Sequence, residues 1–315
     1  MCVNLDVMDT KEFASYLNMK NLKNQPRPFL KWAGSKKQLL IPIKEKVKYA
    51  LDKYSFDMLV DGFLGSGAVT FMMVNEFGDC VKEILANDCN ADLVNCFKAV
   101  QKNVKGLISR LKLLEADFRR TKYPEGFYKK IRSEFNDKVS CRIGVDRAAD
   151  FIFLNHTCFN GLYRVNSRGE FNVPYGKNQK AKIFDEDLLL LDSEAFKCVN
   201  FKVGDFEVDK VEPGWPSKVL FYFDPPYRPI SKTASFSKYT KGDFGESEQL
   251  RLARYCCRLC DNGAGVIVSN SDTADDFYEE NYKGFEIQRV RTIRMMSADV
   301  RRRGQVSEVL LNRFI

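Results

Sequence analysis

Met58-Leu-Val-Asp61-Gly-Phe-Leu-Gly65-Ser-Gly67 joins a short apolar run to a glycine-rich turn, and a helical pattern over 68–77 follows it. Gly65 and Gly67 permit a positive φ and a close approach of the backbone, so the start of the helix can meet the polar end of a ligand. Asp88 comes 21 residues after Gly67, at the end of the next apolar run, where its carboxylate can accept both hydroxyls of a ribose. The sequence therefore predicts a site for an adenosine-containing cofactor, either a nicotinamide dinucleotide or S-adenosylmethionine.

The residues of the turn favour S-adenosylmethionine over a dinucleotide. A negative charge at Asp61 would repel a pyrophosphate, whereas it would stabilise the ammonium or sulfonium group of S-adenosylmethionine. The glycines are also spaced more tightly than in the usual dinucleotide fingerprint. The residues of this part of the chain that we expect to bind the cofactor are Asp61, Phe63, Gly65, Gly67 and Asp88.

Short apolar runs alternate with helical patterns along most of the chain. The runs expected to form buried strands are 58–60, 83–86, 199–203, 219–223 and 265–269. The helical patterns cover 36–54, 68–77, 246–261 and 273–281. This alternation predicts an α/β fold with a doubly wound, mostly parallel, Rossmann-like sheet, in which 286–293 and 306–311 would form a terminal strand pair.

The positive charge of the chain is concentrated in its middle third. The 315 residues include 50 Lys or Arg and 42 Asp or Glu, but the segment 101–182 alone contains 18 basic and 8 acidic residues. This segment interrupts the alternation of strands and helices with helical patterns and a loop rich in Gly, Asn and Pro. Clustered cations bind polyanions by releasing counterions, so we expect an inserted, mainly helical domain that recognises nucleic acid.

The composition argues against several other classes of protein. No apolar run approaches the ~18–20 residues that span a bilayer, and the N-terminus lacks the features of a secretory signal. We therefore expect a cytoplasmic protein rather than an integral membrane protein or a secreted one. His156 is the single histidine, and the ten cysteines include one CxxC without a second ligand pair, so we expect no metal site.

Asp224-Pro-Pro-Tyr227 follows the apolar run 219–223 and offers the chemistry of a methyl transfer. The acid is placed at the carboxyl end of a strand, the edge at which doubly wound sheets bind ligands. Pro225 and Pro226 remove two N–H donors, so the Asp224 side chain and the Pro225 carbonyl can accept both N–H groups of an adenine amine while Tyr227 stacks on the base. Alignment with the sulfonium methyl would give most of the rate, and Asp224 would stabilise the developing charge.

Together and in this order, the motifs resemble the Dam-like, D12-class DNA adenine-N6 methyltransferases. The resemblance runs from about residue 28 to the C-terminus, and it rests on Phe29–Lys36, Asp61–Gly67, Asn155–Gly176 and Asp224–Tyr227. It implies that Trp32 and Lys36 lie at the cofactor end and that Asp88 holds the ribose. It also implies that Asp205 and Phe206 flank the cofactor adenine, and that Asp224 contacts both the methionine and the target base.

The resemblance maps a recognition hairpin onto Phe159–Lys177. It implies that Phe159 stacks beside a flipped base and that the target site is contacted by Lys36, Asn160, Leu162, Arg164 and Lys177. Arg164 is a candidate for a bidentate guanine contact. The implied target is GATC or a related short site, although Lys177 stands where relatives often carry a guanine-reading arginine. Phe159 stands where a tyrosine is often found.

These features predict three parts of the chain: an N-terminal extension at 1–24, a catalytic domain formed by 25–100 and 186–315, and a target-recognition domain at 101–185. We expect a monomer that methylates double-stranded DNA, in restriction–modification or in another role. The alternative is a methyltransferase that acts on RNA or a protein amide. A catalytically inactive DNA-binding module and an NAD-linked dehydrogenase fit less well, because the Asp224–Tyr227 motif is intact and no hydride-transfer acid is visible.

Overall fold

The structure is a computed structural model. It describes residues 25–32, 36, 39–137, 144–208, 218–228, 244–273, 275–293 and 305–314. The predicted N-terminal extension at 1–24 lies outside these residues.

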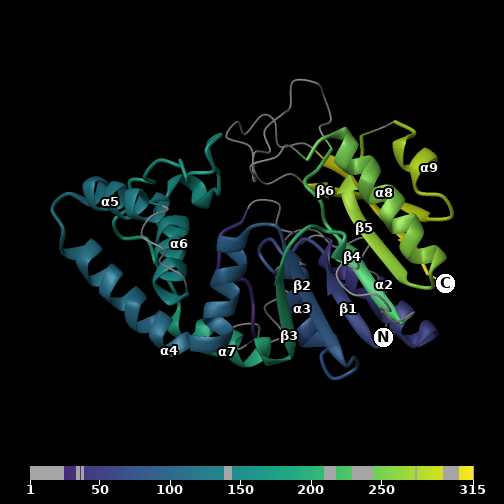
Figure 1. Ribbon diagram of the computed structural model, residues 1–315, viewed down its shortest axis with the longest axis horizontal. Coiled ribbons are helices and arrows are strands. Elements are labelled where there is room, and N and C mark those ends of the chain that lie inside the picture. Colours follow the sequence, from purple (N-terminus) through teal and green to yellow (C-terminus); the bar gives the residue numbers. More distant parts are fainter. Residues whose placement is uncertain are drawn as a thin grey trace.

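Within the described residues, a seven-stranded sheet forms the centre of the molecule, with the strand order β3-β2-β1-β4-β5-β7-β6 (Figure 1). Its strands are β1 (Met58–Asp61), β2 (Glu83–Asp88), β3 (Val199–Val203), β4 (Val219–Phe223), β5 (Gly265–Ser271), β6 (Glu286–Ile293) and β7 (Gln305–Arg313). The strands β1 to β5 pair in parallel, whereas β7 runs antiparallel to β5 and β6. The predicted mostly parallel α/β sheet and its terminal strand pair are confirmed.

The strand order reverses between β1 and β4. The chain passes from β1 outward to β2 and β3, and then returns to place β4 on the opposite side of β1. Asp61 pairs with Tyr222, two residues before Asp224. Because ligands of doubly wound sheets bind at the carboxyl edge where the order reverses, the predicted cofactor turn and the predicted catalytic acid share one region.

Helices cover both faces of the sheet. Successive strand residues point to opposite sides, so a strand whose residues are all apolar needs a covering layer on each face. On one face, buried residues such as Leu59 and Tyr222 pack in the same cluster as α2 (Leu40–Tyr54), α3 (Ala68–Phe77), α4 (Ala91–Arg120) and α7 (Glu186–Ala195). On the other face, Val60 and Phe223 pack with α8 (Glu246–Asp261) and α9 (Phe277–Asn281). The last helix is shorter than the pattern over 273–281 predicts. It begins at Phe277, whose N–H donates to Asp275 Oδ1 at 3.4 Å in the turn that precedes the helix.

The basic segment forms a group of helices beside the sheet, at the left of Figure 1. It contains the second half of α4, α5 (Pro124–Asn136), α6 (Val145–Thr157), the short helix η3 (Phe159–Gly161) and a hairpin. The backbone of α4 is broken at Asn103, where φ is −150° and ψ is 54°, close to the predicted boundary at 100/101. One buried cluster nevertheless continues from the sheet into α5 and α6, so the domain boundaries stay predictions.

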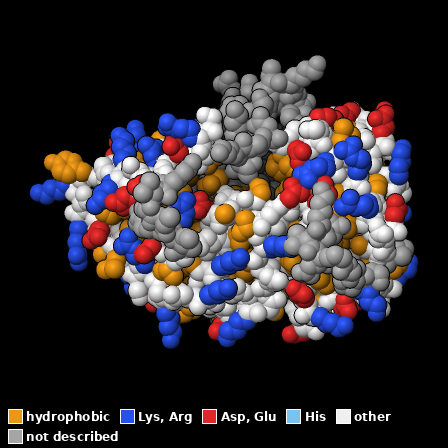
Figure 2. Space-filling model, in the orientation of Figure 1, with side chains coloured by type: hydrophobic (Ala, Val, Ile, Leu, Met, Phe, Trp, Pro, Cys, Tyr) orange, Lys and Arg blue, Asp and Glu red, His pale blue; other side chains and the backbone are white. Residues whose placement is uncertain are grey.

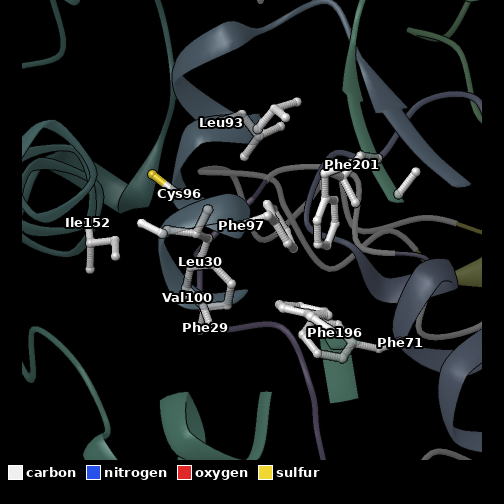
Figure 3. Packing of buried hydrophobic residues seen from close by; sticks show 14 of the residues in the cluster. Phe29, Leu30, Phe71, Leu93, Cys96, Phe97, Val100, Ile152, Phe196 and Phe201 are labelled. Carbon is white, nitrogen blue, oxygen red and sulfur yellow. The ribbon is translucent and has the colours of Figure 1, made fainter. Parts of the chain in front are cut away.

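Phe97 lies at the centre of this cluster (Figure 3). Its ring is buried, and its centroid lies 5.0 Å from that of Phe29, 5.5 Å from Phe196 and 5.4 Å from Phe201. Phe196 begins the short helix η4 (Phe196–Cys198) that leads into β3. Since Phe29 precedes Trp32 by only three residues, this packing fixes the predicted cofactor segment to the sheet.

Replacing Phe97 by alanine is expected to lower the free energy of unfolding by about 3–5 kcal/mol, because it leaves a cavity among three other rings. Urea denaturation measures this change. Leu113→Ala is the control: its side chain is 60% exposed, and we expect a change of about 0.5 kcal/mol or less. A loss below about 1 kcal/mol for Phe97→Ala would contradict this description of the core.

Candidate active site

The glycine-rich turn after β1 adopts the backbone that its sequence predicts. Gly65 and Gly67 have φ angles of +48° and +76°, which side chains disfavour. The Gly65 N–H donates to Asp88 Oδ2 at 3.0 Å, and Asp88 Oδ1 accepts the N–H of Asn90 at 2.9 Å. Burial raises the pKa of Asp88, and these two donors oppose the rise. Asp88 therefore ties the turn to the end of β2.

Asp61, the last residue of β1, is buried below the turn. Its Oδ2 accepts the hydroxyl of Thr70 at 2.7 Å, and its Oδ1 accepts the N–H of Phe63 at 3.3 Å. Burial raises the pKa of Asp61 to about 7; the two hydrogen bonds oppose the rise, and the charges of Asp224 and Asp88 add to it. This acid thus both holds the turn and titrates near neutral pH.

Asp224 follows β4 directly and carries an ion pair. Lys36 Nζ lies 2.7 Å from Asp224 Oδ1, and the lysine side chain is only 6% exposed. Ser269, on β5, donates its hydroxyl to the same oxygen at 3.2 Å. Because the Ser269 hydroxyl donates its proton to Asp224, the Tyr222 hydroxyl is the donor in the hydrogen bond between Tyr222 and Ser269, at 2.7 Å. Burial raises the pKa of Asp224, whereas the charge and hydrogen bond of Lys36 lower it.

Tyr227 lies on the other side of the same lysine. Lys36 Nζ is 4.1 Å from the centre of the Tyr227 ring and also donates to its hydroxyl. The Tyr227 hydroxyl in turn donates to Glu308 Oε2, on β7, at 2.9 Å. Burial and the nearby carboxylates of Asp224 and Glu308 raise the pKa of Tyr227 far above its usual value, so its hydroxyl remains a donor.

Phe63 and Phe206 form a stacked pair at the far end of the turn, with ring centroids 5.6 Å apart. Arg251, from α8, lies over the Phe206 ring at 4.0 Å. It also binds both carboxylate oxygens of Asp205, at 2.8 and 2.7 Å. The structure therefore places Phe206 against Phe63 of the turn, and Arg251 holds both Asp205 and Phe206. That Asp205 and Phe206 flank a cofactor adenine stays a prediction.

Trp32 connects the turn to the inserted segment. The Trp32 side chain lies against Gly65: a Cβ atom placed on this glycine would be 3.4 Å from Trp32 Nε1. The indole stacks on Tyr163, with centroids 5.4 Å apart and the planes inclined by 22°. Trp32 thus lies between the glycine-rich turn and Tyr163 of the hairpin.

The hairpin that we predict to recognise the target is closed by two antiparallel β-bridges, one between Cys158 and Tyr175 and one between Val165 and Phe171. Phe159 is 51% exposed. Arg164 donates from Nε to Asn172 Oδ1 at 2.8 Å, so its guanidinium is held within the hairpin. The other predicted DNA contacts of this segment are Asn160 and Lys177, which are exposed with positive φ angles, and Leu162, which is half-buried.

Sequence reasoning missed the polar residues that surround Asp224–Tyr227 from other elements. They are Gln249, Ser269, Asn270 and Glu308. It also missed Arg251, which pairs with Asp205. One signal was present: Ser269-Asn-Ser271 ends an apolar strand at the same edge of the sheet. The others lie on helix or strand patterns that give no hint of their partners.

A family model described as D12 class N6 adenine-specific DNA methyltransferase matches residues 32–296. The chain belongs to this family. The type II methyltransferase M.MjaIII of Methanocaldococcus jannaschii is 40% identical to it, over 91% of this chain and 99% of the relative. M1.LlaDCHI of Lactococcus lactis subsp. cremoris is 33% identical, over 91% and 95%. A DNA adenine methylase of Haemophilus influenzae is 33% identical, over 91% and 94%.

The chain is thus an adenine-specific DNA methyltransferase, as its motifs predicted. Membership of the family implies a DNA substrate and a methyl donor of the S-adenosylmethionine type. Among the described helices, none is long and apolar enough to cross a membrane. The same part of the chain holds no group of three His, Cys, Asp or Glu that could bind a metal ion. The target sequence and the roles of individual residues stay predictions.

Gly67→Ala is expected to lower the free energy of unfolding by about 1–3 kcal/mol, because a side chain at this positive φ is strained and its Cβ would lie 2.9 Å from the Phe97 ring. Thermal and urea denaturation measure the change. Gly126→Ala, in the first turn of α5, has 3.7 Å to its nearest neighbour and is expected to be neutral or stabilising. Equal stability changes for the two variants would contradict the strain at the turn.

Proposed function

We propose that this methyltransferase transfers the methyl group of S-adenosylmethionine to N6 of an adenine flipped out of double-stranded DNA, at GATC or a related short site. The observation that carries the proposal is the place of Asp224. Its carboxylate lies at the reversal of strand order, directly after β4, which pairs with β1. It already binds the ammonium group of Lys36, which in turn lies over the ring of Tyr227. Methyl transfer to an amine requires a hydrogen-bond acceptor that orients the amine beside the bound cofactor, and Asp224 is placed to be that acceptor.

The residues around the turn fit a cationic nucleoside. Bound S-adenosylmethionine supplies an electrophilic methyl on a sulfonium. In our proposal Asp61 balances its charged amino-acid end, and Asp88 accepts the ribose hydroxyls. The acidic edge suits a cation and disfavours a pyrophosphate. The proposed cofactor-binding residues are Trp32, Lys36, Asp61, Phe63, Gly65, Gly67, Asp88, Asp205, Phe206 and Asp224.

The catalytic residues in this proposal are Asp224, Pro225, Pro226 and Tyr227. Lys36 Nζ lies 2.7 Å from Asp224 Oδ1, the position at which a target amine would donate. When the amine takes the place of the lysine, the carboxylate keeps a hydrogen-bond donor at this oxygen, and Ser269 still donates to it. The Pro225 carbonyl accepts the second N–H, Tyr227 stacks on the base, and Asp224 stabilises the positive charge that develops on the nitrogen.

The inserted segment would bind the DNA. Lys and Arg side chains are distributed around it at the left of Figure 2, and such cations neutralise phosphates. Exposed Phe159 suits the place left beside a flipped base. Arg164 is already oriented by Asn172, which lowers the entropy cost of a guanine contact. The proposed DNA-binding residues are Lys36, Phe159, Asn160, Leu162, Arg164 and Lys177.

The cellular role that we propose is modification of DNA in the cytoplasm, in a restriction–modification system. Two of the relatives named above are type II methyltransferases, and the one with the highest identity among the three is of this kind.

Asp224→Ala is expected to reduce methyl transfer by about 100- to 1000-fold or more, because it removes the acceptor that stabilises the reacting amine. Transfer of a tritiated methyl group from labelled S-adenosylmethionine to an unmethylated duplex measures the rate, and mass spectrometry of the digested DNA identifies N6-methyladenine. The control is Asp187→Ala, at an exposed acid in the first turn of α7, which leaves the rate unchanged.

Two results would count against the proposal. A wild-type protein that methylates no adenine in any duplex would overturn the function itself. Substantial turnover by Asp224→Ala, with DNA binding intact, would overturn the role of Asp224 alone.

Cofactor binding is expected to strengthen with rising pH, because the pKa of Asp61 is raised to about 7 by burial. Below this value the neutral acid predominates and cannot balance a cation; above it the carboxylate does so. The Kd for S-adenosylmethionine should therefore fall by about tenfold between pH 6 and pH 8. Calorimetric titration measures it, with Asp61→Asn as a control that removes the dependence. A constant wild-type Kd over this interval would refute the role of Asp61.

A further inference from the structure

Two buried amides hold the main chain on either side of Tyr227. Gln249, in the first turn of α8, is 1% exposed, and Asn270, on β5, is fully buried. Gln249 Nε2 donates to the Pro226 carbonyl at 2.8 Å, and its Oε1 accepts from Asn270 Nδ2 at 3.0 Å. Asn270 Oδ1 accepts the N–H of Arg228 at 3.2 Å. The chain of three hydrogen bonds thus begins at residue 226 and ends at residue 228.

The direction of this chain is fixed at both ends by the backbone. The Arg228 N–H can only donate, so the Asn270 atom that faces it is the oxygen. The amide nitrogen of Asn270 must then face Gln249, which leaves the Gln249 nitrogen for the Pro226 carbonyl, a group that can only accept. Each side-chain amide therefore has one permitted orientation. Exchanging the oxygen and nitrogen of either amide would bring two donors or two acceptors face to face.

The prolines explain why the protein needs such a device. Pro225 and Pro226 have no N–H, so the main chain offers only carbonyls until Tyr227. If the Pro226 carbonyl were not engaged, it would compete with the Pro225 carbonyl for a donor in the site. In the structure it is turned towards Gln249, away from that competition.

We propose that Gln249 and Asn270 are positioning residues for the methyl transfer. By binding the Pro226 carbonyl and the Arg228 N–H, they leave the Pro225 carbonyl as the main-chain acceptor next to Asp224 and set the plane of the Tyr227 ring between them. They act through the tetrapeptide and do not touch the reacting amine. The inference rests on the proposed function, since it assumes that Asp224 and Pro225 receive the two N–H groups of adenine N6.

Further contacts hold the same turn and support this reading. Ser271 Oγ donates to the Arg228 carbonyl at 2.8 Å. The Arg228 guanidinium pairs with Glu246, on α8, and with Asp275, each at 3.0 Å. The backbone after Tyr227 is thus anchored to β5 and α8. If the hydrogen bonds of Gln249 and Asn270 were lost, this anchored segment could not move to form others in their place.

The test is Gln249→Glu, which keeps the shape and the acceptor for Asn270 but replaces the donor to Pro226 by an oxygen. We expect kcat to fall by about 10- to 100-fold through misplacement of the acceptors. The Kd for S-adenosylmethionine and the KM for DNA should stay within about twofold, because no residue that contacts either is changed. Single-turnover rates are normalised to the protein that binds cofactor, so unfolded molecules do not contribute.

Gln101→Glu is the matched control. Gln101, on α4, is also a partly buried amide that donates to main-chain carbonyls, those of Phe196 and Val199, each at 2.7 Å. The same substitution there should lower stability without changing kcat of the folded protein. Gln249→Met is a second variant that buries no charge; it should fold if Gln249→Glu does not and should show the same loss of kcat.

The outcomes separate this inference from the proposed function. A wild-type kcat in Gln249→Met, or in folded Gln249→Glu at a pH at which the introduced carboxyl is ionised, overturns the positioning role, even when Asp224→Ala is inactive. A loss of kcat in Gln101→Glu equal to that in Gln249→Glu also overturns it, because the effect would then be a general one. An active Asp224→Ala protein would instead remove the proposed function on which the inference rests.

Discussion

The ion pair between Lys36 and Asp224 joins the parts of this molecule that must act together. Asp224 is delivered to the edge of the sheet by β4, whose five residues are all buried between β1 and β5. A carboxylate in such a place is costly unless a partner compensates for the lost water. The partner comes from the segment before α2, far away in sequence, which also carries Trp32. This ion pair thus holds the segment of Trp32 and Lys36 against Asp224, and the stacking of Trp32 on Tyr163 joins that segment to the inserted one.

The remaining polar groups of the site come from strands on the far side of β4. Ser269 reaches Asp224, Asn270 reaches the backbone after Tyr227, and Glu308 accepts the Tyr227 hydroxyl. Ser269 and Asn270 lie on β5, which pairs in parallel with β4, and Glu308 lies on β7, which runs antiparallel to β5. The mixed end of the sheet therefore has a role beyond covering an edge: it supplies hydrogen-bond partners to Asp224, Tyr227 and Arg228.

Much of the fold could be predicted because each element carries a local signal. β3, β4, α3 and α8 lie at the predicted residues, since apolar runs and helical spacing alone define such elements. The turn at Gly65 and Gly67 and the acid at Asp88 were also visible, because positive φ angles and strand ends leave residue-type signatures. The roles of Gln249, Asn270, Glu308 and Arg251 were not visible, since they depend on which elements meet in space. Arg164 illustrates the same limit: its hydrogen bond to Asn172 within the hairpin depends on a pairing that no local pattern reveals.

The most direct test of the account is a structure of the protein with an unreactive S-adenosylmethionine analogue and a duplex that contains the target adenine. The account predicts that the adenine lies outside the helix with its N6 about 2.7–3.2 Å from both the Asp224 carboxylate and the Pro225 carbonyl, while Lys36 has left Asp224. An extruded adenine whose N6 faces other groups, with Asp224 still bound to Lys36, would contradict it.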